Sequence, residues 1–214
     1  MKPIQALLAL FAFAFLPLHA ASLDDLTWTT TAGEVTITDC NEAATGELII
    51  PDTIEGKPVT SIGGQAFSNC TSLTSITIPD GVTSIGEGAF YDCNSLTSIT
   101  IGNGVTSIGD FAFYKCTSLT SITIPDGVTS IGEYAFGGCE SLTSMTIGNS
   151  VTSIGNEAFF ACRSLTAVTF LGDAPKIGDS AFEKSSPTIY READAKGWGD
   201  TLAGRPVKLI AEKP

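Results

Sequence analysis

Apolar and polar positions repeat along most of the chain with a period of 23 residues. Each repeat contains an Ile-Gly pair, an Ala-Phe pair, a Ser-Leu pair and a short alternation of apolar and hydroxyl residues. A fixed period of this length indicates a solenoid, because one repeat cannot bury its own apolar face and must stack on its neighbours. The Ile-Gly pairs begin at Ile62, Ile85, Ile108, Ile131, Ile154 and Ile177, and the Ala-Phe pairs end at Phe67, Phe90, Phe113, Phe136, Phe159 and Phe182.

The stretch after each Ser-Leu pair predicts a strand and then a turn. Ile76, Thr77 and Ile78 alternate with the period of two that sends apolar groups inward and hydroxyls outward. Pro79-Asp80-Gly81 then supplies turn chemistry, because proline fixes φ and glycine accepts positive φ. We therefore expect parallel strands, about 4.8 Å apart, in neighbouring coils.

The other half of the repeat predicts a second short extended piece and a helical turn. Val82 and Ile85 point inward from the extended piece, and Ala89, Phe90 and Cys93 fall on one side of a single helical turn. The sequence therefore predicts a leucine-rich-repeat solenoid of 23-residue repeats. Each coil would hold short parallel β-strands and a short helical turn, and the array would be capped at both ends.

The two ends depart from the period, as expected where a terminal coil would otherwise expose apolar surface and strand edges. Residues 26–39 alternate like a hairpin, and the Cys and Leu of the repeat are lost after Phe182. We expect a signal peptide at 1–20, an N-terminal cap with a first irregular repeat at 21–58, the repeat array at 59–182 and a C-terminal cap at 183–214.

The first segment has the pattern of a signal peptide. Lys2 precedes the apolar run from Ala6 to Leu16, and the small residues Ala20 and Ala21 offer a cleavage site. The run is too short for a membrane span, which needs about 20 apolar residues. The sequence therefore predicts an exported protein, periplasmic, cell-surface or extracellular, without stable membrane insertion.

Charge and composition exclude several function classes. The chain has 23 acidic and 11 basic residues, and Lys115 and Arg163 are the only basic residues between Thr60 and Phe170, so a nucleic acid is not an expected partner. The single histidine, His19, lies in the segment expected to be removed, so the mature chain has no imidazole for acid-base chemistry or metal binding. We expect a monomer with no cofactor and no metal.

Five of the six cysteines occupy one position of the repeat. Stacking would bring their Cα atoms to about 5 Å, which disulfide geometry allows, yet five residues cannot all pair within one row. Buried, reduced thiols that act as small apolar spacers are the favoured interpretation. One or two bridges remain the alternative, with Cys40 as a partner outside the row of Cys70, Cys93, Cys116, Cys139 and Cys162.

These motifs resemble the BspA-like leucine-rich-repeat family of bacterial secreted and surface proteins. The resemblance covers about Val59 to Phe182 and rests on V-T-S-I-G-x-x-A-F-x-x-C-x-S-L-T-S-I-T-I-P, which recurs from coil to coil. It implies an exported solenoid involved in adhesion or in binding host proteins, and it transfers no catalytic residue.

The outward hydroxyls of the strands are the candidate binding surface. A rigid sheet of hydroxyl donors and acceptors would suit a protein or glycan ligand. Other interpretations are ordinary solvent-facing strand residues, a purely structural solenoid, or a threonine array that matches ice. The candidate residues are Ser75, Thr77, Ser98, Thr100, Ser121, Thr123, Ser144, Thr146 and Thr169.

An enzyme with a site in the C-terminal region is the less favoured alternative. Its candidate residues are charged side chains close in sequence, which more often serve solubility: Lys176, Asp179, Glu183, Asp194 and Asp200. We therefore expect a non-catalytic binding protein.

Overall fold

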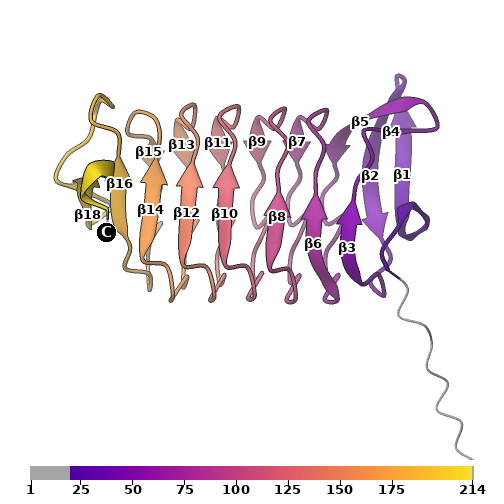
Figure 1. The fold of residues 1–214 in the computed structure, drawn as a ribbon, viewed down its shortest axis with the longest axis horizontal. Coiled ribbons are helices and arrows are strands. Elements are labelled where there is room, and N and C mark those ends of the chain that lie inside the picture. The colour runs from indigo at the N-terminus through magenta and orange to yellow at the C-terminus, as the bar shows by residue number, and fades with distance from the viewer. Residues whose placement is uncertain (1–19, 214) are drawn as a thin grey trace, which may run out of the picture.

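The computed structural model describes residues 20–213 as an elongated β-solenoid, in which successive coils lie side by side in chain order (Figure 1). The expected signal peptide lies outside the described residues, apart from Ala20. Among residues 20–213, no helix is long and apolar enough to cross a membrane.

The N-terminal end is closed by an antiparallel hairpin. A 3₁₀ segment, η1 (Leu23–Asp25), leads into β1 (Leu26–Thr31), which pairs with β2 (Glu34–Cys40). β2 then pairs in parallel with β5 (Lys57–Ile62), and β4 (Thr53–Ile54) pairs antiparallel with the same strand. The hairpin thereby covers the apolar end of the first coil.

One wall of the solenoid is a nine-stranded sheet in the order β1-β2-β5-β7-β9-β11-β13-β15, with β4 at the side of β5. From β5 onward, each strand pairs with the Ser-Ile or Lys-Ile dipeptide of the next coil. The two-residue strands of this wall are β7 (Ser84–Ile85), β9 (Ser107–Ile108), β11 (Ser130–Ile131), β13 (Ser153–Ile154) and β15 (Lys176–Ile177).

The opposite wall consists of two sheets. The three-stranded sheet contains β3 (Gly46–Ile49), β6 (Leu73–Thr77) and β8 (Ser98–Thr100). The six-stranded sheet contains β10 (Ser121–Ile124), β12 (Ser144–Ile147), β14 (Ala167–Phe170), β16 (Thr188–Arg191), β18 (Arg205–Leu209) and β17 (Thr201–Leu202). Parallel pairing at a spacing of 23 residues, as between Thr123 and Thr146, confirms the predicted solenoid.

The expected helical turn is replaced by consecutive β-turns. Gly88 and Asp92 have positive φ angles of 59° and 61°, which interrupt any helix. The amide of Tyr91 donates to the oxygen of Gly88 at 2.9 Å, whereas the amide of Phe90 donates to Ala112 of the next coil at 2.7 Å. Amides such as that of Phe90 therefore form hydrogen bonds between coils and not within a helix. Within residues 20–213 the only helices are η1 and the 3₁₀ segment η2 (Ile210–Glu212).

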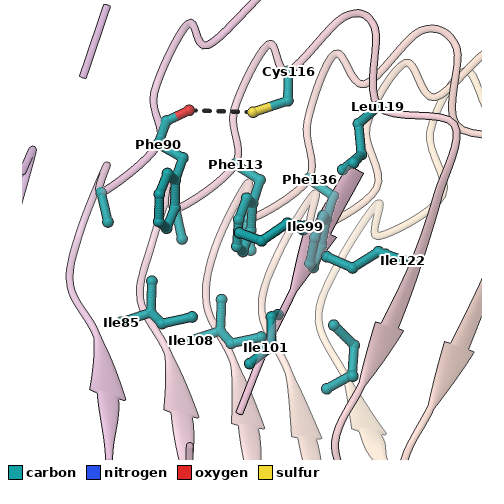
Figure 2. Packing of buried hydrophobic residues seen from close by; sticks show 14 of the residues in the cluster. Ile85, Phe90, Ile99, Ile101, Ile108, Phe113, Cys116, Leu119, Ile122 and Phe136 are labelled. Atoms are coloured by element: carbon teal, nitrogen blue, oxygen red, sulfur yellow. Dashed lines mark hydrogen bonds between the residues drawn. The ribbon is translucent and has the colours of Figure 1, made fainter. Parts of the chain in front are cut away.

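The core consists of continuous rows of identical side chains. The rings of Phe90 and Phe113 stack with centroids 5.1 Å apart, and Phe136 follows at 5.1 Å (Figure 2). These rings are completely buried. Because each ring packs against its equivalents in both neighbouring coils, no coil buries its phenylalanine alone.

All six cysteines are free and buried, in agreement with the favoured interpretation of reduced thiols. The thiols are also more than apolar spacers, because four of them donate to a phenylalanine carbonyl of the preceding coil at 3.0–3.2 Å. The row continues with Ser185, whose hydroxyl donates to Phe159 at 2.7 Å.

The C-terminal residues add three further strands, β16, β17 and β18, to the wall. β16 pairs in parallel with β14, and β18 pairs with β16. The ring of Trp198 contacts Phe170 edge-on at 5.1 Å, and its indole nitrogen donates to the oxygen of Gly172 at 3.2 Å. Trp198 therefore packs against the core at the C-terminal end, where the 23-residue motif has ended and no repeat residue is present to do so.

Candidate functional site

The predicted hydroxyl rows exist on the wall that contains β6, β8, β10 and β12. Thr77 pairs with Thr100, and Thr123 pairs with Thr146, so these side chains stand in line on one face. The serine row has the same register, with Ser75 opposite Ser98 and Ser121 opposite Ser144. We call this surface the hydroxyl face; it consists of Ser75, Thr77, Ser98, Thr100, Ser121, Thr123, Ser144 and Thr146.

The sheet is interrupted in the middle of the hydroxyl face. β8 and β10 are neighbours but do not pair, which divides the wall into its two sheets. At this junction the amide of Thr120 lies 3.4 Å from the oxygen of Thr97, whereas the equivalent bond from Thr143 to Thr120 measures 2.9 Å. In Figure 1 the arrows of β8 and β10 also stand further apart than those of β10 and β12.

Proline contributes to this interruption. The amides of Gly148 and Leu171 donate to the oxygens of Ile124 and Ile147, each at 3.0 Å. Pro125 stands at the equivalent position beside Ile101 and has no amide hydrogen to donate.

The missing donor is not the whole cause of the interruption. Pro79 occupies the same position of the repeat, yet the strands beside it, β3 and β6, still pair. The pairing of β3 and β6 shows that one absent backbone bond can be tolerated in this wall.

A groove of about 730 Å³ lies across the interruption and spans four coils, from Ile49 to Pro125. Its lining includes five residues of the hydroxyl face: Thr77, Ser98, Thr100, Ser121 and Thr123. The four residues that belong to β8 and β10 are exposed, whereas Thr77 and Thr146 are half-buried. The hydroxyls with the greatest access to a ligand therefore lie where the sheet is open.

The hydroxyls of this groove differ from those of the other threonine rows. Thr97 and Thr143 donate their hydroxyls to the backbone oxygen of the equivalent threonine one coil back, at 3.0 and 3.1 Å. Thr106, on the opposite wall, does the same at 3.0 Å. By contrast, no hydrogen bond to any of residues 20–213 uses the hydroxyl of Thr100 or Thr123. These two hydroxyls remain available to a ligand.

The threonine row does not extend to Thr169 as an exposed surface, contrary to the prediction. Thr169 continues the register but is only 6% exposed, and Lys213, which follows η2, donates its ammonium to the Thr169 hydroxyl at 3.1 Å. The expectation that Thr169 faces solvent is therefore wrong, because the C-terminal segment covers it. At the other end the row begins with Ile49, which is 65% exposed and pairs with Thr77.

The charged residues considered for an enzyme do not all line one cavity. Only Asp179 and Glu183 line a common cavity, of about 500 Å³, and Lys176, Asp194 and Asp200 are not part of its lining. Among residues 20–213, no group of three or more His, Cys, Asp or Glu side chains is placed to hold a metal. The buried thiols are poorly suited to nucleophilic chemistry, because burial raises the pKa of Cys162 to about 12 and that of Cys139 well above its ordinary value.

Sequence reasoning missed an aromatic cluster on the turn edge of the coils. Tyr91 stacks on Tyr114 with centroids 5.3 Å apart, and Phe111 stacks on Tyr134 at 5.2 Å. Edge-on contacts join the two stacks and extend them to Phe160. All five rings are half-buried. The signal was present in the sequence, since these aromatics occupy two positions of the repeat where other coils carry Gln, Ser, Gly or Glu.

Comparison with known proteins points to one family. The family model described as BspA type leucine rich repeat region matches residues 59–188 in six copies. A leucine-rich-repeat protein of T. pallidum is 28% identical, with a TM-score of 0.70 over 78% of this chain and 89% of that chain. A leucine-rich cell surface protein of Faecalibacterium prausnitzii is 32% identical, with a TM-score of 0.61 over 80% of this chain and 54% of that chain. No curated protein sequence matches the chain.

Proposed function

Because the chain belongs to the BspA-type leucine-rich-repeat family, we propose that it is an exported, non-catalytic protein that binds a protein or glycan ligand on its hydroxyl face. The proposal places the ligand in the groove of about 730 Å³ between Ile49 and Pro125. Repeat solenoids offer extended binding surfaces, because their stacked coils hold side chains at fixed intervals.

The observation that carries the proposal is the set of uncommitted hydroxyls at the open junction of the sheet. Thr100 and Thr123 are exposed and their hydroxyls make no hydrogen bond within the described chain, whereas the hydroxyls of threonines such as Thr97 and Thr106 donate to backbone carbonyls. A hydroxyl can donate one hydrogen bond and accept two, so this row fits ligands rich in polar groups. The exposed Ile49 adds an apolar contact at the end of the groove.

The non-catalytic part of the proposal rests on the chemistry of the mature chain. Its residues include no histidine after His19, and the cavity that Asp179 and Glu183 share is not lined by Lys176, Asp194 or Asp200. The free thiols face the core and not a cavity. Binding is the role that the exposed side chains support best.

Export is supported by the first 20 residues and by one solved relative. The signal-peptide pattern ends at Ala20, and the F. prausnitzii protein is described as a cell surface protein. The Ala21 nitrogen donates to the oxygen of Thr45 at 2.8 Å, and in a chain cleaved before Ala21 this nitrogen would be an α-ammonium, which is also a donor. Residues 1–20 fused to a reporter that is active only after export should give activity, and deletion of the apolar run Ala6 to Leu16 should abolish it.

The binding proposal is tested with the mature chain, residues 21–214, on a glycan array and a protein array. The double variant Thr100→Lys, Thr123→Lys places two long cations in the groove and should weaken ligand binding by more than tenfold. The matched control is Thr129→Lys, Thr152→Lys, which changes two exposed threonines on the opposite wall. Thermal melting of both variants checks that the fold is retained.

The outcomes separate the possibilities. Loss of binding in the first variant alone would support the hydroxyl face as the site. A ligand that both variants bind as tightly as the mature chain would place binding elsewhere. The absence of any ligand on both arrays would contradict a protein- or glycan-binding role and favour a purely structural solenoid.

A further inference from the structure

A further cavity, of about 330 Å³, lies at the end of the aromatic cluster. Its lining residues include the aromatic Tyr91 and Phe111, the acidic Glu87, and Gln65 and Asn69. It shares no lining residue with the groove on the hydroxyl face. The two cavities are therefore independent sites.

The cavity exists because two aromatic stacks end there. One face of Tyr91 is covered by Tyr114, and one face of Phe111 is covered by Tyr134. The next position in the Phe111 row is Gly88, which has no side chain to continue the stack. The open ends of both stacks therefore border the same space.

Elsewhere in the cluster, the chain's own lysines already contact the rings. The Lys184 ammonium lies 4.5 Å from the centroid of Phe160, and the Lys115 ammonium lies 5.6 Å from that of Tyr114. A cation over an aromatic ring is attracted by the electron-rich ring face. The residue that corresponds to Lys115 in the coil of Tyr91 is Asp92, so the ring of Tyr91 has no such cation from its own coil.

The charge around the cavity favours a cationic occupant. No hydrogen bond or ion pair with residues 20–213 engages the Glu87 carboxylate, whereas that of Asp110, one coil further, accepts the Glu133 amide at 2.7 Å. The whole chain carries a net charge of −12, which attracts basic partners from a distance. The cavity thus combines two ring faces with an available carboxylate.

We propose that this cavity binds the side-chain cation of a lysine or arginine in a basic segment of a partner protein. The ring faces of Tyr91 and Phe111 contact the cation and its aliphatic stem, and Glu87 neutralises its charge. This inference goes beyond the proposed function, since it concerns another surface and would hold even if the hydroxyl face bound nothing.

The decisive variant is Gly88→Tyr, which continues the aromatic row into the cavity. A Cβ at Gly88 would lie 3.5 Å from the Gln65 side chain, an ordinary contact distance. The φ of +59° is no obstacle, because Phe111 and Tyr134 occupy the same position of the repeat with φ angles of 55° and 50°. The matched control is Ser180→Tyr, which adds a tyrosine at the equivalent position of a distant coil, where φ is 54°.

The probe is an end-blocked Gly-Lys-Gly-Lys-Gly peptide, titrated into the ¹⁵N-labelled mature chain and followed by amide chemical shifts. Saturable shifts at Gly88, Tyr91 and Phe111 are expected in the mature chain and in Ser180→Tyr. Binding should weaken more than tenfold in Gly88→Tyr and about three- to tenfold in Glu87→Gln or Tyr91→Leu. The peptide with acetylated lysines should not bind, because acetylation removes the charge.

Three results would overturn the proposal. Shifts that persist in Gly88→Tyr would show that the peptide binds elsewhere, and shifts spread evenly over the acidic surface would show only long-range attraction. The third is binding of N-acetylglucosamine or galactose at these residues without binding of the lysine peptide, which would make the cavity a sugar site. Each of these readouts is separate from the array experiment on the hydroxyl face.

Discussion

The thiol of Cys116 donates a hydrogen bond to the carbonyl oxygen of Phe90, one coil back, at 3.2 Å (Figure 2). The carbonyl is buried and also accepts a longer bond from the Cys93 amide, at 3.4 Å, so the thiol supplies its shorter hydrogen bond in a place where a weakly satisfied acceptor is costly. Because Ser185 makes the same bond to Phe159 at 2.7 Å, the position requires a small side chain with one donor and not sulfur chemistry. A hydrogen-bonding role therefore accounts for free, buried cysteines at this position of the repeat.

Removal of this donor should destabilise the solenoid. We expect Cys116→Ala to lower the free energy of unfolding by about 1–3 kcal/mol, because the Phe90 oxygen keeps only the 3.4 Å bond from the Cys93 amide and a small cavity forms. Cys116→Ser should cost less, since a hydroxyl restores the bond. Urea unfolding of the two variants beside the mature chain measures the difference; equal losses would show that the thiol acts only as an apolar spacer.

The buried thiols should make stability fall at alkaline pH. Burial raises the pKa of Cys162 from its ordinary value of 9.0 to about 12. Between these values the unfolded chain loses a proton that the folded chain keeps, so rising pH favours unfolding. This contribution to stability is fully present below about pH 9 and decreases by up to about 1.4 kcal/mol per pH unit above it.

The measurement is the urea midpoint at pH 8 and at pH 10.5. Tyrosine and lysine side chains also titrate in this range, so the control is Cys162→Ser, whose hydroxyl keeps the donor and does not ionise. The mature chain should lose more stability than this variant. Parallel losses in both proteins would contradict a role for the Cys162 thiol.

The stacked phenylalanines predict a large effect of a single deletion. Phe113 contacts Phe90 and Phe136 in both neighbouring coils, so Phe113→Ala should cost about 3–5 kcal/mol. Phe111→Ala, two residues away in the half-buried aromatic cluster, is the matched control and should cost less. Similar unfolding midpoints for the two variants would refute the continuous core row.

The period of the sequence was sufficient to predict most of the fold. Identical residues 23 positions apart, such as Thr123 and Thr146, pair because stacking equivalent coils is the only way to bury their apolar neighbours. The same logic correctly placed Thr100 and Thr123 on an outward face. The prediction of a helical turn from Ala89, Phe90 and Cys93 was wrong. These three side chains all point into the core, but successive β-turns and not a helix place them there.

The features that the sequence did not reveal depend on contacts between distant segments. Thr169 has the same repeat position as Thr146, but Lys213, from the last turn of the described chain, donates to its hydroxyl. The junction between β8 and β10 depends on how two whole coils sit against each other, which no local motif encodes. The aromatic cluster was overlooked because its members vary between repeats, whereas period analysis selects residues that do not vary.

The Ile-Gly pair gives the sharpest steric prediction. A Cβ on Gly109 would lie 2.7 Å from the carbonyl carbon of Gly86 and from the amide nitrogen of Glu87 in the preceding coil. Its φ is in the ordinary range, so space alone excludes a side chain, and the fixed strand spacing prevents the backbone from moving away. Gly109→Ala should therefore cost about 1–3 kcal/mol or more.

Gly199→Ala is the control for this prediction, because a Cβ there would meet nothing closer than the Thr201 oxygen at 3.8 Å and φ is again ordinary. This variant should unfold at the same urea concentration as the mature chain, or slightly higher, since alanine restricts the unfolded chain more than glycine does. A midpoint for Gly109→Ala as high as that of Gly199→Ala would mean that the coils can separate locally. In that case the close approach of neighbouring backbones could no longer explain why glycine follows isoleucine in each repeat.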